Sequence, residues 1–134
     1  MKRGRRRWLS RAAAAVELAI VTPILLTMLF GIIEYGWLFT VRQALTTAAR
    51  EGARTAALPG SQVSDVESRV SDYMQTLGLT TYTTDVTVDE YNNPTGDVTV
   101  SVPYADVTLV GSYFGGPPSG NITASCSMRK EGID

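Results

Sequence analysis

The stretch that decides the fold runs from Ala12 to Phe39 and reads AAAAVELAIVTPILLTMLFGIIEYGWLF. Its only charged residues, Glu17 and Glu34, stand near its two ends. As a helix, its 28 residues would extend about 42 Å, which exceeds the roughly 30 Å hydrocarbon core of a bilayer. This pattern predicts a transmembrane helix over residues 13–39.

Charges are distributed unevenly along the 134 residues. Residues 1–12 hold six of the twelve Lys and Arg residues and no acid, a charge of +6. Six bases and thirteen acids give residues 13–134 a charge of −7, although the whole chain has a net charge of −1. Basic segments beside a membrane helix are retained in the cytoplasm. We therefore expect a basic cytoplasmic leader over residues 1–12 and an extracytoplasmic C-terminus.

Three other interpretations of the basic N-terminus compete with a role in orienting the membrane helix. A cleaved secretory signal conflicts with the length of the apolar run and with the lack of a small-x-small site after it. A twin-arginine export signal would use Arg5-Arg6-Arg7, but arginines beside a membrane helix more often set its orientation. Nucleic-acid binding explains a basic tail at a membrane helix less well than retention does. We predict membrane lipid as a partner, and no nucleic acid.

Glu17 is the informative residue of the apolar stretch. A carboxylate about one turn inside such a helix is costly in lipid, and such groups are candidates for function. The alternative is a solvated Glu17 at the level of the headgroups. Glu34 is expected at the outer interface, where Tyr35 and Trp37 would form an aromatic belt.

Three further residues bear on the packing of this helix. Pro23 lacks a backbone N–H and can kink the helix. Gly31 and Gly36 allow the close approach of a neighbouring helix, as small residues do in membranes.

The helical pattern continues beyond the membrane to about residue 57, where Pro59-Gly60 ends it. Small and apolar residues recur every four positions, as Ala44-Leu45, Ala48-Ala49, Gly52-Ala53 and Ala56-Ala57. This stripe must be covered, either by later elements of the chain or by neighbouring helices.

A second, amphipathic helix and a small sheet are predicted after this spine. Ser64-Asp65-Val66-Glu67 has the form of a capping box, and Gly78 is a natural terminator. Three runs then alternate with period two, and they contain Val86 and Val88, Val98 to Val102, and Ile122 to Met128. Asn92 to Gly96 is a turn cluster, and Asp106 to Phe114 is ambiguous between a short helix and an extended segment. The predicted fold is α+β, with an extracytoplasmic head over residues 40–134 that includes the end of the spine.

Catalytic chemistry is poorly represented in this chain. It has no His and one Cys, which excludes His-based triads, zinc clusters and internal disulfides. A hydrolase using acids or Ser125 is disfavoured because no acids are paired at a recognisable spacing. Calcium binding by Asp85, Asp89, Glu90 and Asp97 is disfavoured because they lack the ligand pattern of a calcium loop. We predict no enzyme, catalytic residue, metal, cofactor or small-molecule substrate.

The N-terminal third resembles a known family. The residues that carry the resemblance are Ala13-Ala14-Ala15-Val16-Glu17-Leu18-Ala19, Pro23, Phe30-Gly31-Ile32-Ile33-Glu34-Tyr35-Gly36, Val41-Arg42-Gln43-Ala44 and Ala48-Ala49-Arg50-Glu51-Gly52-Ala53-Arg54. They are similar to TadE-like proteins, minor pilins or pseudopilins of the bacterial Tad (type IVc) pilus system. The resemblance implies a pilin-like fold and a place in the inner membrane or, after incorporation, in a pilus. It also implies other pilin subunits, a prepilin peptidase and inner-membrane Tad assembly proteins as partners.

The resemblance also implies a processing site. Prepilin peptidases cut after a small residue, usually Gly, and leave Glu at the fifth position of the mature chain. Counting back from Glu17 makes Ala13 the new N-terminus and Ala12 the residue before the cut, so that Ala replaces Gly. The function implied is assembly of a Tad-type pilus, in adhesion, surface attachment or secretion, with Glu17 pairing with the new amine. The alternative is an uncleaved, single-pass membrane anchor for an extracytoplasmic binding module.

Overall fold

The computed structural model describes residues 3–88, 95–111, 116 and 119–130, and the side chains from residue 11 onward within these ranges. The side chains of most of the expected leader, the larger part of the expected turn at residues 92–96, and residues 112–114 lie outside the described parts. The chain divides into two compact units, residues 1–36 and residues 37–134, which are treated separately.

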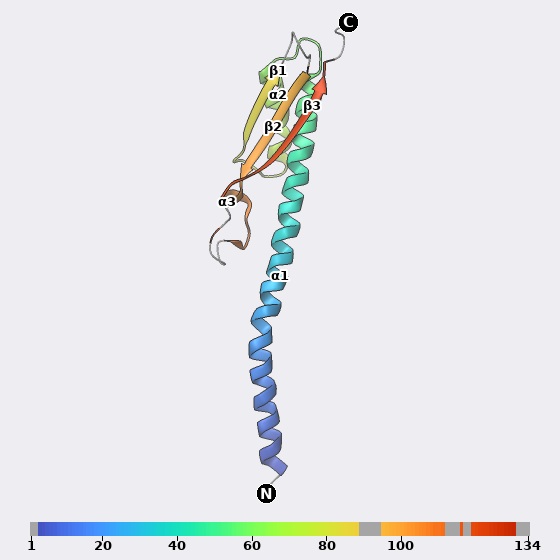
Figure 1. Ribbon diagram of the computed structural model, residues 1–134. Helices are drawn as coiled ribbons and strands as arrows, with labels where there is room; N and C mark the ends of the chain where they lie inside the picture. The colour runs from blue at the N-terminus through green and yellow to red at the C-terminus, as the bar shows by residue number, and fades with distance from the viewer. Residues whose placement is uncertain (1–2, 89–94, 112–115, 117–118, 131–134) are drawn as a thin grey trace. The chain divides into compact units, whose positions relative to one another are not determined.

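Helix α1 runs from Arg3 to Ala56 and contributes to both units (Figure 1). It begins within the expected leader rather than at about residue 12, and it ends one residue before the predicted position. In the first unit its large apolar side chains are exposed, for example Leu18 at 65% and Ile24 at 64%. The segment Arg11–Ala56 contains a window long and apolar enough to cross a membrane, judged by length and composition.

Helix α2, Val63–Thr76, starts and ends through backbone groups that find specific partners. The Asp65 carboxylate accepts a hydrogen bond of 3.0 Å from the backbone N–H of Gln62, the N-cap residue. The expected cap at Ser64 was therefore wrong by two positions, because Asp65 rather than Glu67 reaches back to the helix start. At the other end Gly78 has a φ of +71°, and the N–H groups of Gly78 and Leu79 donate to Gln75 and Met74. This is the glycine-terminated end that was predicted.

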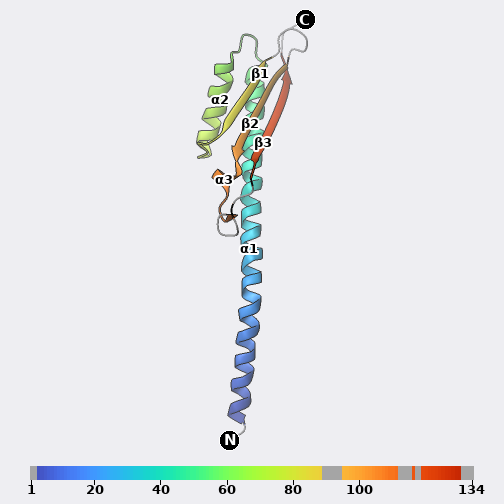
Figure 2. The same cartoon turned by 60° about the vertical axis from the view of Figure 1, so that its left-hand side comes forward.

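The sheet contains β1 (Thr83–Val88), β2 (Thr95–Pro103) and β3 (Asn121–Arg129) in antiparallel order β1-β2-β3. The three alternating runs therefore form the predicted strands. The register pairs Val86 with Val98 and Val98 with Cys126, so the apolar residues share one face. That face packs on α1 and α2 in the second unit, as Figure 2 shows, while Ser, Thr and Asp residues occupy the other.

The core of the second unit lies between the sheet and the two helices. Its buried members are Val41, Leu45, Ala48, Ala49, Ala53, Ala56, Val66, Val70, Met74, Val98, Val100, Val102, Val107 and Ile122. The small residues on α1 let the other elements approach its backbone closely. A Cβ added at Gly52 would lie 2.9 Å from a methyl of Val70 and 3.0 Å from one of Val98. A Cβ added at Gly96 of β2 would lie 2.5 Å from the Cβ of Ala56, so both glycines are required by packing.

A short helix, α3 (Tyr104–Val107), follows β2 and resolves the start of the ambiguous segment as helical. The indole N–H of Trp37 donates a hydrogen bond of 2.7 Å to the backbone carbonyl of Val107, which is itself buried. Trp37 was expected in an interfacial aromatic belt with Tyr35. In the structure Trp37 bonds to α3 within the second unit, because the α3 carbonyl lies within reach of its only donor. The aromatic belt stays a prediction.

Candidate assembly site on helix α1

The residues expected to form the processing site lie together near the start of α1. Ala12, Ala13 and Glu17 are all exposed and helical. Ala13 and Glu17 are four residues apart, so they face the same side of the helix one turn from each other. An amine created at Ala13 would therefore arise beside the Glu17 carboxylate without any rearrangement of the helix between them.

The expected scissile bond lies inside regular helix. It joins Ala12 to Ala13, nine residues beyond the first residue of α1. The residues around it are four successive alanines, and alanine is the strongest helix former. A peptidase that binds an extended chain must therefore first unwind this turn.

Glu17 stands on an apolar part of the helix. Ile20 and Val21, at the next turn, are 64% and 46% exposed. Among the described residues, no hydrogen bond or ion pair engages the Glu17 side chain. If this segment lies in lipid, a partner for the carboxylate must come from outside the described side chains, because an isolated charge there is costly.

The other residues predicted to matter for helix packing lie further along α1. Pro23 is inside the helix, and its carbonyl accepts a hydrogen bond of 2.8 Å from the Thr27 hydroxyl. Gly31 and Gly36 have open space where a Cβ would be. Glu34 is half-buried and engaged in an interaction. The structure thus places Ala12, Ala13 and Glu17 within about one helical turn of each other. Pro23, Gly31, Glu34 and Gly36 lie further along α1 and are not part of this group.

The small-residue stripe of the spine is covered by the chain's own elements. Ala48, Ala49, Ala53 and Ala56 are fully buried against α2 and the sheet. This decides between the two alternatives left open by the sequence. The structure also gives Trp37 and Gly96 packing roles that the sequence did not predict. Trp37 bonds to Val107 of α3, and Gly96 lies against Ala56 of α1. Both roles depend on elements distant along the chain.

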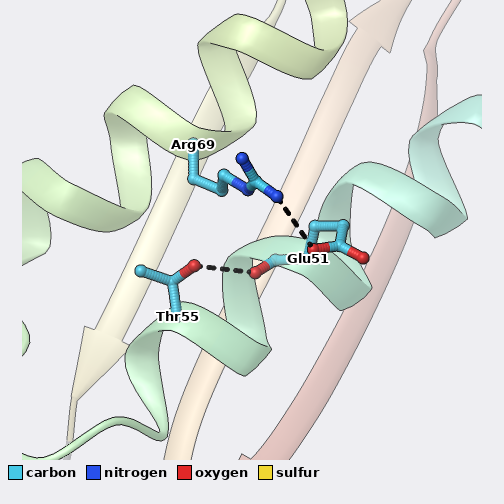
Figure 3. A network of polar contacts seen from close by, with 3 residues as sticks. All are labelled: Glu51, Thr55 and Arg69. Carbon is cyan, nitrogen blue, oxygen red and sulfur yellow. Dashed lines mark hydrogen bonds and ion pairs between the residues drawn. The ribbon is translucent and has the colours of Figure 1, made fainter.

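A polar groove runs beside this contact, between α1 and α2. Its lining includes Glu51, Arg69 and Asp72. Arg69 forms an ion pair of 3.7 Å with Glu51, and the Thr55 hydroxyl donates to the Glu51 carbonyl at 3.0 Å (Figure 3). Because both charged side chains are substantially exposed, this pair contributes little to stability. Its effect is to turn Glu51, the one acid of α1 within the second unit, toward α2.

Four acidic residues near the hairpin were candidates for calcium binding, although the sequence disfavoured it. Asp85 and Asp97 are exposed on the outer face of the sheet, whereas Asp89 and Glu90 lie outside the described residues. Within the described parts, no group of three or more His, Cys, Asp or Glu residues could hold a metal ion.

Part of the chain is similar to a known protein family. The model of the TadE-like protein family matches residues 12–54. The matched segment begins at Ala12, the residue before the expected cut, and ends in the last turn of α1. No curated protein and no solved structure matches the chain. The resemblance inferred from the sequence is confirmed over this segment.

Proposed function

We propose that this chain, whose residues 12–54 match the TadE-like protein family, is a minor pilin or pseudopilin that takes part in assembling a Tad-type pilus without enzymatic activity. The observation that carries the proposal is that the matched segment lies within a single helix. This helix holds Glu17 near its start and an exposed apolar stretch in its middle, and its end forms the core of the head. Such a molecule couples a membrane segment to an extracytoplasmic head.

The proposed mechanism begins with cleavage by a prepilin peptidase between Ala12 and Ala13. Cleavage gives Ala13 a protonated amine next to the Glu17 carboxylate, on the same side of the helix. Either charge alone is expensive in lipid, whereas a pair offsets much of that cost. The amine of a neighbouring subunit can make the same pair, and Glu17 then favours docking of one helix on another in a single register.

The proposed location is the bacterial inner membrane, crossed once, with the N-terminus in the cytoplasm and the head outside. The charge bias of +6 before the apolar stretch supports this orientation. The proposed partners are other pilin or pseudopilin subunits, the prepilin peptidase and the inner-membrane Tad assembly proteins. Adhesion, surface attachment and secretion are the processes that such an assembly would serve.

The pairing is tested with Glu17→Gln, which removes the charge and keeps the size of the side chain. We expect normal membrane insertion and at least a tenfold loss of the protein from the sheared pilus fraction, measured by immunoblot. Glu34→Gln is the matched control, because it makes the same change near the other end of the apolar stretch. Normal recovery of Glu17→Gln in the pilus fraction would refute the role of the pair.

A second candidate is an uncleaved, membrane-anchored binding module that never joins a pilus. The observation that favours it is Ala12, which replaces the usual Gly before the cut. The intact mass of the protein extracted from membranes separates the two. A chain that starts at Ala13 supports the pilin, and a full-length chain supports the anchor.

A further inference from the structure

Two faces of the second unit carry opposite charge. The first, the arginine face, consists of Arg50 and Arg54, one turn apart on α1, and both side chains are exposed. Among the described residues, no ion pair engages them. The acid nearest to them in sequence, Glu51, is turned toward Arg69 of α2 (Figure 3). The arginine face therefore presents two positive charges one helical turn apart and no acid.

The second face is the outer face of the sheet. Three rows of side chains cross the strands there, Thr83-Ser101-Thr123, Asp85-Thr99-Ser125 and Thr87-Asp97-Ser127. They are exposed or half-buried, and all are short. Asp85 and Asp97 are the charges within these rows, while Arg129 stands beyond the last row. The result is a flat surface with two carboxylates among hydroxyl groups.

The dimensions of the two faces match. Asp85 and Asp97 lie diagonally across neighbouring strands, a spacing of roughly 7–8 Å. Arg50 and Arg54 are one helical turn apart, with roughly 5–6 Å between their Cβ atoms. The long arginine side chains easily cover the difference, and guanidinium groups also donate to the hydroxyls between the carboxylates.

The two faces point in opposite directions. The arginine face lies on the side of α1 away from the stripe that meets the core, and the outer sheet face lies opposite the valines that meet the same core. A molecule therefore cannot satisfy one face with the other. Contact between two copies through these faces is head-to-tail, and such contacts generate open filaments or rings rather than closed symmetric dimers.

We propose that the arginine face of one copy docks on the outer sheet face of a second copy of this chain. The inference rests on the proposed function, in which the membrane helices of subunits associate. The docking adds a contact between the heads of these subunits outside the membrane. Charge complementarity selects this occupant, because two guanidinium groups meet two carboxylates. Within the parts of the chain that the structure describes, no helix covers the outer sheet face.

The test uses two differently tagged full-length chains, co-expressed in their native membrane, both with Cys126→Ala. One carries Thr46→Cys, one helical turn before Arg50 of the arginine face, and the other carries Thr99→Cys at the centre of the sheet face. We expect a short thiol cross-linker to join the two tagged chains. A product joining two Thr46→Cys chains in its place, or either chain to a different protein, would overturn the proposal.

Charge reversal tests the complementarity. Asp85→Lys with Asp97→Lys on the Thr99→Cys chain should lower the yield of cross-linked product about tenfold. Adding Arg50→Glu with Arg54→Glu to the Thr46→Cys chain should restore it, a recovery that general misfolding cannot produce. The matched control, Glu67→Lys with Asp72→Lys, makes the same charge change on exposed positions of α2 and should leave the yield unchanged. Equal losses in both reversals, or no recovery, would refute the interface.

The outcome is independent of the proposed pilus role. If the Thr46→Cys and Thr99→Cys chains enter the pilus fraction normally but give no cross-link, the interface is overturned and the proposed function stands. A charge-dependent cross-link in a protein that never enters the pilus fraction would support the interface and overturn the proposed function.

Discussion

At the scale of single residues, the lack of a side chain at Gly52 allows α1, α2 and β2 of the head to pack closely. Gly52 belongs to the matched family segment, and in the structure it lies where these three elements pack closely together. Glycine costs about 1 kcal/mol relative to alanine inside a helix. The close approach of Val66, Val70 and Val98 explains why this cost is tolerated here.

Gly52→Val should lower the free energy of unfolding of the head by about 1–3 kcal/mol, because the added methyl groups overlap those of Val70 and Val98. The measurement is the thermal midpoint of the detergent-solubilised chain, followed by near-ultraviolet circular dichroism. Gly36→Val is the matched control, since nothing lies within 4 Å of a Cβ at that position. Equal midpoints for the two variants would contradict the packing role of Gly52.

At the scale of elements, α3 is a four-residue helix that cannot be stable by itself. Its position depends on neighbours: Val107 enters the core, and the Val107 carbonyl accepts the hydrogen bond from Trp37 of α1. The tie joins the end of the apolar stretch to a segment distant in the sequence.

Trp37→Phe should weaken this tie by about 0.5–1.5 kcal/mol, since it removes the donor and retains an aromatic ring. We expect faster amide hydrogen exchange in α3 and unchanged exchange in the sheet, measured by mass spectrometry. Tyr35→Phe provides the comparison, because Tyr35 is 77% exposed and its hydroxyl should not influence α3. Exchange that rises equally in β2 and α3 would argue against a local role.

At the scale of the whole molecule, the proposed cleavage would change both the length and the net charge of the chain. The full chain has a net charge of −1, whereas removal of residues 1–12 would leave side chains with a charge of −7 and one new amine. The proposed cut lies in a helical run of alanines, which opposes the unwinding that a peptidase needs.

Ala12→Gly should therefore raise the fraction of processed chain, because glycine loosens the helix by about 1 kcal/mol and matches the usual residue before the cut. The intact masses of precursor and mature chain measure this fraction. Ala15→Gly loosens the same turn without changing the residue before the cut, so it separates the two causes. A fraction unchanged in Ala12→Gly would argue that this bond is not the processing site.

The sequence by itself determined the elements and the residues of the candidate site. The long apolar helix, the second helix and the three strands follow from local periodicity, because each pattern is repeated within one element. The spacing of Ala13 and Glu17 also follows, since four residues always make about one helical turn.

Only the tertiary structure decided what covers each face. The small-residue stripe of α1 packs on the chain's own head, Trp37 bonds to α3, and the arginine face and the acidic sheet face point away from each other. These results depend on contacts between elements far apart in sequence. Periodicity shows that an apolar face must be covered, but it does not show which element covers it. The capping residue of α2 was missed for a local reason, because the Asp65 carboxylate accepts from the backbone N–H of Gln62, whereas the Ser64-to-Glu67 pattern placed the start two residues later.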